Sequence, residues 1–327
     1  MRDVTVDTAV ITDAVALASR APSLHNSQPW RWVSEGSAVS LFLDRTAAPR
    51  HTDPTGRELV ISCGAVLDHF RVAMAAAGWA CNVDRFPNPN NLDQLASVDF
   101  TPMDFVTEAH RRRADAIGRR RTDRLPFAAP IGGNAFLSRL TAAPAAAGVS
   151  LHVIADQSRA ELIRASELAR SARRYDSAYH AELVGWTADV EVAEGIPAAA
   201  LLSGVENDHM PMSRDFPTAG RSDRRAELTE DQAEIVVLCT ADDTRADHVR
   251  CGEALSWVLL EATLADLATC TLTHLTEVSE SRDIVAALTG STDTPQLLVR
   301  VGTAPATADL GPPTPRRPAS DVLEIRG

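Results

Sequence analysis

The chain has 327 residues, of which 45% are hydrophobic, and its formal net charge is −12. This length and composition predict a globular protein of one large or two ordinary domains and exclude a disordered chain. The negative charge argues against binding to nucleic acid through its phosphates. All 32 basic residues are arginine, so Schiff-base chemistry and a P-loop lysine are excluded, and a bound anion would be held by guanidinium groups.

The cysteine pattern predicts a reducing compartment. The cysteines are scattered, odd in number and without C-x-x-C spacing, so we expect neither a disulfide framework nor a zinc site. They are Cys63, Cys81, Cys239, Cys251 and Cys270. The charged N-terminal residues do not resemble a signal peptide, and no apolar run approaches the length needed to span a bilayer. We therefore expect a cytoplasmic protein with no membrane partner.

Hydrophobic periodicity predicts helices and strands that alternate along the chain. The predicted helices cover residues 10–19, 63–77, 106–121, 160–173 and 251–267. The predicted strands cover residues 30–33, 39–43, 151–155, 235–240 and 295–302. The order does not form a long βαβ series, so the predicted fold class is α+β.

Two of the predicted helices share a pattern that suggests an internal duplication. Each is expected to open with Cys-Gly, at Cys63 and Cys251, and each then carries leucine and alanine at matching positions. A chance match between two apolar helices is the alternative. Because the order of the surrounding elements also agrees, we favour two units, residues 1–110 and 111–327.

The second unit contains a long segment of weak periodicity, residues 175–232. It holds Trp186, Met210, Met212 and Phe216. Long insertions of this kind are often lids or binding loops, and a solvated surface decoration is the alternative. The sequence leaves both interpretations open.

Three short stretches carry the candidate chemistry. Residues 21–32 read APSLHNSQPWRW and place polar side chains directly before a tryptophan-rich strand. Residues 119–124 (RRRTDR) and the pair at 316–317 gather arginine and a hydroxyl, which suits a dianionic phosphate. A solvated helix face is the alternative for one isolated cluster, and a third arginine run at 221–225 could be a decoy.

The motifs A-P-S-x-x-N-x-Q-P-W and R-R-[ST]-x-R-x-x-F, with a TPRRP tail, resemble the FMN-dependent nitroreductase superfamily and its Acg branch. The likeness covers most of the chain except the insertion. It implies an α+β nitroreductase-like fold that binds FMN and takes electrons from NADPH or NADH. The electron acceptor would be a small molecule such as a nitroaromatic compound or a quinone.

The resemblance also implies roles for individual residues. The flavin ring or ribityl chain would contact Pro22, Ser23, His25, Asn26 and Gln28. The phosphate would be held by Arg120, Arg121, Thr122, Arg124, Arg316 and Arg317. Near the redox edge of the flavin, Thr271 and Thr273 are weaker candidates, and His274 is more typical of a structural histidine. We expect Trp30 and Trp32 to be core residues of a strand.

The order of the motifs is inverted relative to an ordinary nitroreductase, in which the arginine motif comes first. If the arginine motif opens the second unit, the counterpart of residues 22–26 falls at 144–148, where the polar side chains are absent. Since family dimers bind each flavin between two subunits, the tandem chain would build one complete site from two halves. The expectation is one FMN per chain and a monomer that imitates a dimer.

Two functions remain open from the sequence. The first is an NAD(P)H-dependent flavin oxidoreductase, in which the cofactor supplies the chemistry and no side chain is predicted to be catalytic. The second is an FMN storage protein whose insertion covers the flavin and blocks the nicotinamide. Flavin-fragmenting or dehalogenating chemistry is a third possibility that no residue demands. Metal-ligand spacing and a G-x-S-x-G elbow are both missing from the sequence.

Overall fold

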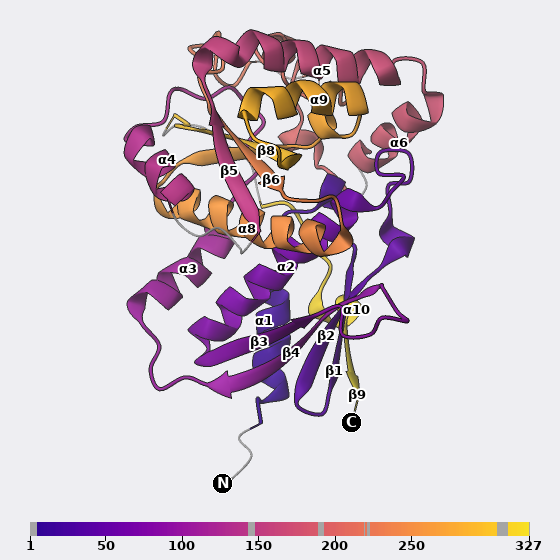
Figure 1. Ribbon diagram of the computed structural model, residues 1–327, viewed down its shortest axis with the longest axis vertical. Coiled ribbons are helices and arrows are strands. Elements are labelled where there is room, and N and C mark those ends of the chain that lie inside the picture. The colour runs from indigo at the N-terminus through magenta and orange to yellow at the C-terminus, as the bar shows by residue number, and fades with distance from the viewer. Residues whose placement is uncertain are drawn as a thin grey trace.

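Two β-sheets lie at opposite ends of the molecule, with a pair of long helices between them (Figure 1). The computed structural model describes residues 5–142, 148–188, 193–218, 220, 223–305 and 313–326. The central helices are α2 (Arg57–Ala76) and α8 (Arg245–Leu264). This arrangement confirms the predicted α+β class.

The first sheet has strand order β3-β4-β2-β1-β9. Its strands are β1 (Trp30–Glu35), β2 (Ala38–Leu43), β3 (Trp79–Arg85), β4 (Gln94–Pro102) and β9 (Leu323–Arg326). One face packs on α1 (Thr8–Ala18) and α2, and Trp30 and Trp32 are fully buried in this core, as predicted. Burial alternates along β2 because the other face meets water.

The C-terminal strand lies in the sheet of the N-terminal half. Strand β9 pairs in parallel with β1, in the register Trp32 to Leu323. The last strand of the second predicted unit, residues 111–327, therefore joins the sheet of the first predicted unit, residues 1–110. Backbone pairing across the sheet edge decides this position, and no hydrophobic pattern in four terminal residues could reveal it.

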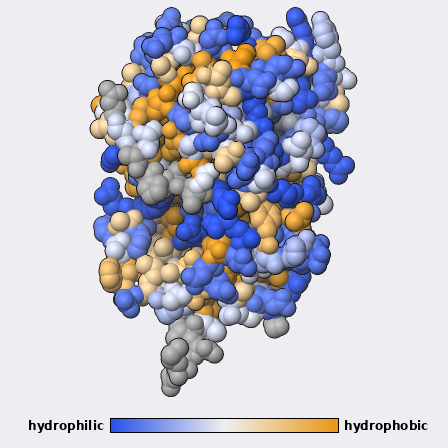
Figure 2. All heavy atoms as spheres, viewed as in Figure 1, coloured by the Kyte–Doolittle hydropathy of each residue, from blue (hydrophilic) through white to orange (hydrophobic). Residues whose placement is uncertain are grey.

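The second sheet is fully antiparallel, in the order β5-β6-β8-β7. Its strands are β5 (Val149–Ile154), β6 (Glu234–Thr240), β7 (Ala268–Leu272) and β8 (Thr294–Gly302). Helix α8 covers one face, while α5 (Arg159–Arg173) and α9 (Ser279–Thr289) cover the other. Burial on both faces explains the continuous apolar runs of β6 and β8. Figure 2 shows hydrophobic residues over the edge strand β5.

Every predicted helix and strand is present, with shifted ends. Helix α3 spans Glu108–Arg119. The elements that the periodicity missed are β3, β4, β7, β9, α4 (Gly133–Ala142), α6 (Ser177–Thr187), α7 (Gly204–Asp208), α9 and α10 (Ala319–Val322). Strands β3 and β4 were missed because polar residues occupy their exposed face. Residues 143–147, where the second copy of the motif would fall, lie outside the described residues.

The two Cys-Gly pairs do not open their helices but lie well inside them, at the point where α2 and α8 cross. A Cβ added to Gly64 would lie 2.1 Å from the carbonyl oxygen of Val249. A Cβ added to Gly252 would lie 2.0 Å from the carbonyl oxygen of Ile61. The same spacing of 188 residues separates Gly64 from Gly252 and Ile61 from Val249, so the contact is nearly symmetric. Only glycine permits this approach of the two backbones.

Helix α2 corrects the expectation that no apolar run could span a membrane. By length and composition it qualifies, with a mean hydropathy of 1.5, and 78% of the apolar window is buried inside the protein. It packs between the first sheet and α8 (Figure 1). Its apolar character is therefore that of the core helix of a soluble fold.

Candidate functional site

A cavity of about 880 Å³ lies where four distant segments meet. Its lining comes from the motif at 20–26, the arginine segment 120–125, the insertion at 193–200 and the tail at 313–316. A smaller cavity of about 140 Å³ adjoins it and has more apolar walls, including Ile61, Leu255 and Leu297. Both cavities are lined by Pro22, Ser23, His25, Thr122 and Arg124. The fold thus brings together the motifs that the sequence separates by a hundred residues.

The first motif, residues 21–32, has an unusual backbone conformation. Its short helical turn spans Leu24–Asn26, and three residues have left-handed φ values: His25 at 50°, Asn26 at 60° and Gln28 at 49°. Such conformations are costly for residues other than glycine and collect at binding sites. The Ser23 hydroxyl accepts the Gln28 N–H at 3.1 Å and helps to hold the turn.

Four arginines gather around the larger cavity without a carboxylate partner among the described residues: Arg20, Arg120, Arg121 and Arg316. Arg120 is 5% exposed, and its Nε and Nη1 have no hydrogen-bond partner among the residues that the structure describes. Its Nη2 donates to the Arg20 carbonyl at 3.0 Å, and Arg316 Nε donates to the Ser19 carbonyl at 3.0 Å.

The charge of this cluster is unbalanced. Burial, with Arg20 and Arg121 nearby, lowers the pKa of Arg120 to about 10. Burial, with Arg120 nearby, lowers the pKa of Arg316 to about 9. Clustered guanidinium groups with free donors, held in place by backbone carbonyls, fit a dianionic phosphate. Arg20 was not predicted, although it directly precedes the APS motif.

Arg124 extends the positive charge toward the smaller cavity. Its guanidinium lies 5.5 Å from the centre of the Phe216 ring, and burial lowers its pKa. Other buried arginines are paired: Arg225 with Asp123 at 2.5 Å and Arg300 with Asp231 at 2.6 Å. The pairing of Arg225 supports the decoy interpretation for that residue, whereas Arg224 pairs with Glu206 at 2.7 Å and lines the larger cavity.

Two predicted contacts lie elsewhere. The Gln28 side chain is fully buried, donates to the Ala193 carbonyl at 2.6 Å and accepts the Arg317 N–H at 2.9 Å. The Arg317 side chain lies 3.8 Å from Asp44 and 3.7 Å from Glu194. The predicted pair therefore divides, and only Arg316 joins the arginine cluster. Through these contacts, Gln28 and Arg317 connect the C-terminal tail and the insertion to the first motif.

The remaining candidates lie on the smaller cavity. Thr271 and Thr273 line it, and the Thr273 hydroxyl accepts from Arg214 Nη2 at 2.9 Å. His274 Nε2 lies 3.0 Å from the Ser166 hydroxyl, which agrees with a structural role. Glu58 and Arg214 also line this cavity but were not predicted. In the sequence Glu58 lies before the helix predicted at 63–77, as a single acidic residue outside the three candidate motifs.

Described residues of the insertion pack over the site. The Glu182 carboxylate on α6 accepts from the His51 N–H at 2.9 Å and the Thr52 N–H at 2.7 Å. The rings of Trp186 and Phe216 lie 6.4 and 5.5 Å from the ring of His25. The insertion therefore forms a cover that contacts the motif directly.

Buried histidines make stability depend on pH. Burial lowers the pKa of His274 to about 3, and it lowers the pKa of His25 and His69 well below the ordinary value. The unfolded chain binds protons at these histidines below about pH 6.5, whereas the folded protein does not. The free energy of unfolding should therefore fall on acidification below pH 6.5, by up to about 4 kcal/mol per pH unit for three groups.

Urea unfolding at pH 7 and pH 5.5 measures this dependence. Replacing His274 with glutamine, which can keep a hydrogen bond to Ser166, should reduce the pH dependence by about one third, since one of three groups is removed. An undiminished dependence in this variant would show that His274 is protonated equally in both states.

The fold and the site together define a class of protein: two α+β halves around a helix pair, with an arginine-lined cavity at their junction. The chain belongs to the Acg branch of the nitroreductase family. It is 56% identical over 326 residues to a Mycobacterium tuberculosis protein named "Putative NAD(P)H nitroreductase acg", covering 100% of this chain and 98% of that protein. It is 38% identical to "Putative NAD(P)H nitroreductase Rv3131" of the same organism, covering 97% and 92%. No family model matches the chain.

Two solved structures align with part of the chain, with TM-scores below 0.5. The FMN-dependent nitroreductase NfnB from Mycobacterium smegmatis, in complex with NADPH, has a TM-score of 0.42 and 18% identity, covering 67% of this chain and 100% of that one. A protein described as a "putative nitroreductase from anabaena variabilis" has a TM-score of 0.41 and 10% identity, covering 82% of this chain and 69% of that one.

Proposed function

We propose that this protein is an FMN-binding, NAD(P)H-dependent oxidoreductase of the nitroreductase type that reduces a small molecule such as a nitroaromatic compound or a quinone. The observation that carries the proposal is the unbalanced arginine cluster, in which two donor groups of the buried Arg120 have no acceptor within the described part of the chain. A flavin phosphate supplies the missing negative charge. The names of the M. tuberculosis relatives support the nicotinamide donor.

The residues present fit the parts of FMN. Arg20, Arg120 and Arg316 would hold the phosphate in the larger cavity. Thr122 and Arg124 lie between this cavity and the smaller one, whose more apolar walls suit a ring system. When bound, the flavin would supply two-electron transfer between the nicotinamide and the acceptor. The chain would fix its position and exclude water.

The geometry of the central helices supports an internal duplication. Matching residues contact one another around Gly64 and Gly252, as they do in an isologous dimer interface. The arginine cluster combines Arg20 from the N-terminal half with Arg120 and Arg316 from later segments. We infer one FMN per chain in a cytoplasmic monomer that imitates a dimer. Extracted flavin per protein and the mass in solution test this inference.

The cover favours storage of FMN as a second candidate function. Asn26 Nδ2 donates to the carbonyl of Ala193, a residue of the insertion, at 3.4 Å, and Gln28 donates to the same carbonyl. A closed cover would keep a nicotinamide from stacking on the flavin. The storage function would then hold the cofactor without ordinary reductase activity.

Anaerobic addition of NADPH to the FMN-loaded protein separates the two functions. Rapid bleaching of the flavin absorbance supports the reductase and contradicts storage, whereas bleaching by dithionite alone does the reverse. A protein that cannot be loaded with FMN contradicts both.

Glu182 offers a variant that tests the cover itself. Replacing Glu182 with alanine removes the carboxylate that holds Thr52, including its hydroxyl at 2.7 Å, so the cover should open more often. We expect at least tenfold faster bleaching by NADPH or faster loss of FMN on dilution. Replacing Glu167, an exposed residue of α5, with alanine serves as the control. Unchanged rates would show that the cover does not limit access.

A further inference from the structure

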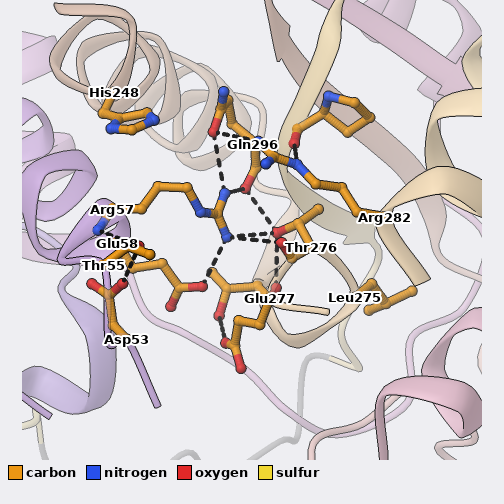
Figure 3. A network of polar contacts seen from close by, with 12 residues as sticks. Asp53, Thr55, Arg57, Glu58, His248, Leu275, Thr276, Glu277, Arg282 and Gln296 are labelled. Carbon is orange, nitrogen blue, oxygen red and sulfur yellow. Dashed lines mark hydrogen bonds and ion pairs between the residues drawn. The ribbon is translucent and has the colours of Figure 1, made fainter. Parts of the chain in front are cut away.

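A buried carboxyl group faces the smaller cavity. Glu58 lies in the first turn of α2, is 3% exposed and lines this cavity together with Arg124 and Thr273. Its Oε1 accepts from Arg57 Nη2 at 3.1 Å, while its Oε2 has no donor among the described residues. Figure 3 shows the second oxygen free of any dashed contact. One side of this carboxyl group is therefore available to share or release a proton.

The neighbours of Glu58 do not stabilise a negative charge fully. Arg57 divides its hydrogen bonds among several acceptors, including the Gln296 carbonyl at 2.5 Å and the Thr276 hydroxyl at 3.0 Å (Figure 3). Asp53, in the loop before α2, already accepts the Leu59 N–H at 2.9 Å. Asp53 and Glu58 are both close enough to Arg57 for its positive charge to lower their pKa, so this one arginine serves two carboxyl groups.

A second buried carboxylate lies beside Glu58. Glu277 forms an ion pair with Arg214 and accepts from the Thr273 hydroxyl at 3.1 Å. Arg214 outweighs the effect of burial and holds the pKa of Glu277 at about 2, so Glu277 keeps its charge. Burial and the charge of Glu277 raise the pKa of Glu58 well above its usual range. Because like charges in a buried pair cannot both form easily, the pair retains one proton, on Glu58.

We propose that Glu58 is a catalytic proton donor to an electron acceptor bound against the flavin ring at the smaller cavity. The inference rests on the proposed flavin oxidoreductase function. With a quinone as acceptor, one quinone oxygen would receive a hydride, which is the chemistry that a reduced flavin supplies when bound, while the Glu58 O–H bond breaks and its proton goes to the second quinone oxygen. The quinone would become a hydroquinone, and Glu58 would become a carboxylate that Arg57 and Arg214 stabilise until water returns the proton.

The other polar groups of this cavity are less suited to the task. Burial lowers the pKa of His25 well below neutrality and that of His274 to about 3, so both rings are weak proton carriers in this site. Burial raises the pKa of the Cys270 thiol. Among the described lining residues, Glu58 is the carboxyl group.

Infrared spectroscopy tests the protonation state without measuring activity. The protein at pH 7.5 should show the carbonyl stretch of a neutral carboxylic acid that disappears in Glu58→Gln. The control is Glu253→Gln, which removes a carboxylate that is 2% exposed and paired with Arg85 at 2.7 Å, away from both cavities. This control should keep the band that Glu58→Gln loses. If Glu58→Gln loses no such band, Glu58 is ionised and the proposal is wrong.

Reoxidation kinetics test the proton transfer. FMN-loaded protein, reduced with dithionite and mixed anaerobically with p-benzoquinone, should reoxidise about a hundredfold more slowly in Glu58→Gln, since a positioned acid contributes about 10²–10⁴-fold. Equal rates in wild type and Glu58→Gln, with FMN bound normally, would overturn the role of Glu58 alone. Failure of wild type to bind FMN, or to react with the quinone, would instead overturn the proposed function on which it rests.

Discussion

Replacing Arg120 with methionine is expected to weaken FMN binding at least a hundredfold and, at the same time, to stabilise the flavin-free protein. Arg120 is buried, and two of its donors have no acceptor in the described ranges of the chain, so a phosphate would accept charge-assisted hydrogen bonds worth about 1.5–3 kcal/mol each. Loss of two such bonds exceeds the roughly 2.7 kcal/mol that corresponds to a hundredfold change in Kd.

The opposite effect on stability follows from the same geometry. Without a bound anion, the Arg120 charge lies near Arg20 and Arg121 and is removed from water. Methionine keeps much of the apolar volume and removes this unfavourable charge, which should raise the free energy of unfolding by about 1 kcal/mol.

Fluorescence titration with FMN and urea unfolding of the flavin-free protein measure the two effects. The control is Arg111→Met on α3, where Arg111 is 58% exposed and pairs only weakly with Glu108. In Arg111→Met, the FMN affinity and the free energy of unfolding should both stay nearly unchanged. Normal FMN affinity in Arg120→Met would contradict the assignment of the phosphate site.

Replacing Gly64 with alanine should destabilise the protein by more than about 3 kcal/mol or prevent folding, because overpacking against backbone cannot be relieved by a rotamer change. The new Cβ would lie 2.1 Å from the Val249 carbonyl oxygen and 2.9 Å from Gly252 Cα. Helices α2 and α8 must then separate, and they carry both cores and the wall of the smaller cavity.

Gly185 provides the matched control for this substitution. It lies in helix α6, is exposed, and a Cβ added there would meet nothing within 4 Å. Gly185→Ala should therefore be neutral or stabilise by up to about 1 kcal/mol, through helix propensity. Thermal and urea unfolding of the two variants give the comparison. If Gly64→Ala proves as stable as Gly185→Ala, the close crossing of α2 and α8 is not required.

The parts of the site that could be predicted are those formed by residues that are contiguous in the sequence. Residues 21–32 and 119–124 are short and distinctive, and the structure brings Ser23, Thr122 and Arg124 to one junction between the two cavities. The burial of Trp30 and Trp32 could also be predicted, because they alternate along a strand with Arg31 between them.

The parts that could not be predicted depend on contacts between distant segments. Arg316 and Arg317 are adjacent in sequence, yet one joins the arginine cluster and the other pairs with Asp44 and Glu194, because neighbouring side chains of an extended segment point in different directions. Glu58 becomes unusual only because the segments carrying Thr276 and Glu277 fold against it.

The amino-acid sequence by itself determined the α+β class, the ten principal elements, the family and the two arginine-bearing motifs, because periodicity and local motifs are properties of contiguous residues. Only the tertiary structure decided the crossing at Gly64 and Gly252, the place of the last strand in the first sheet, the packing of the insertion over the motif and the separation of Arg317 from the cluster. Each of these depends on which buried surfaces and hydrogen-bonding groups meet across long distances in the chain, and that is settled by packing of the whole molecule.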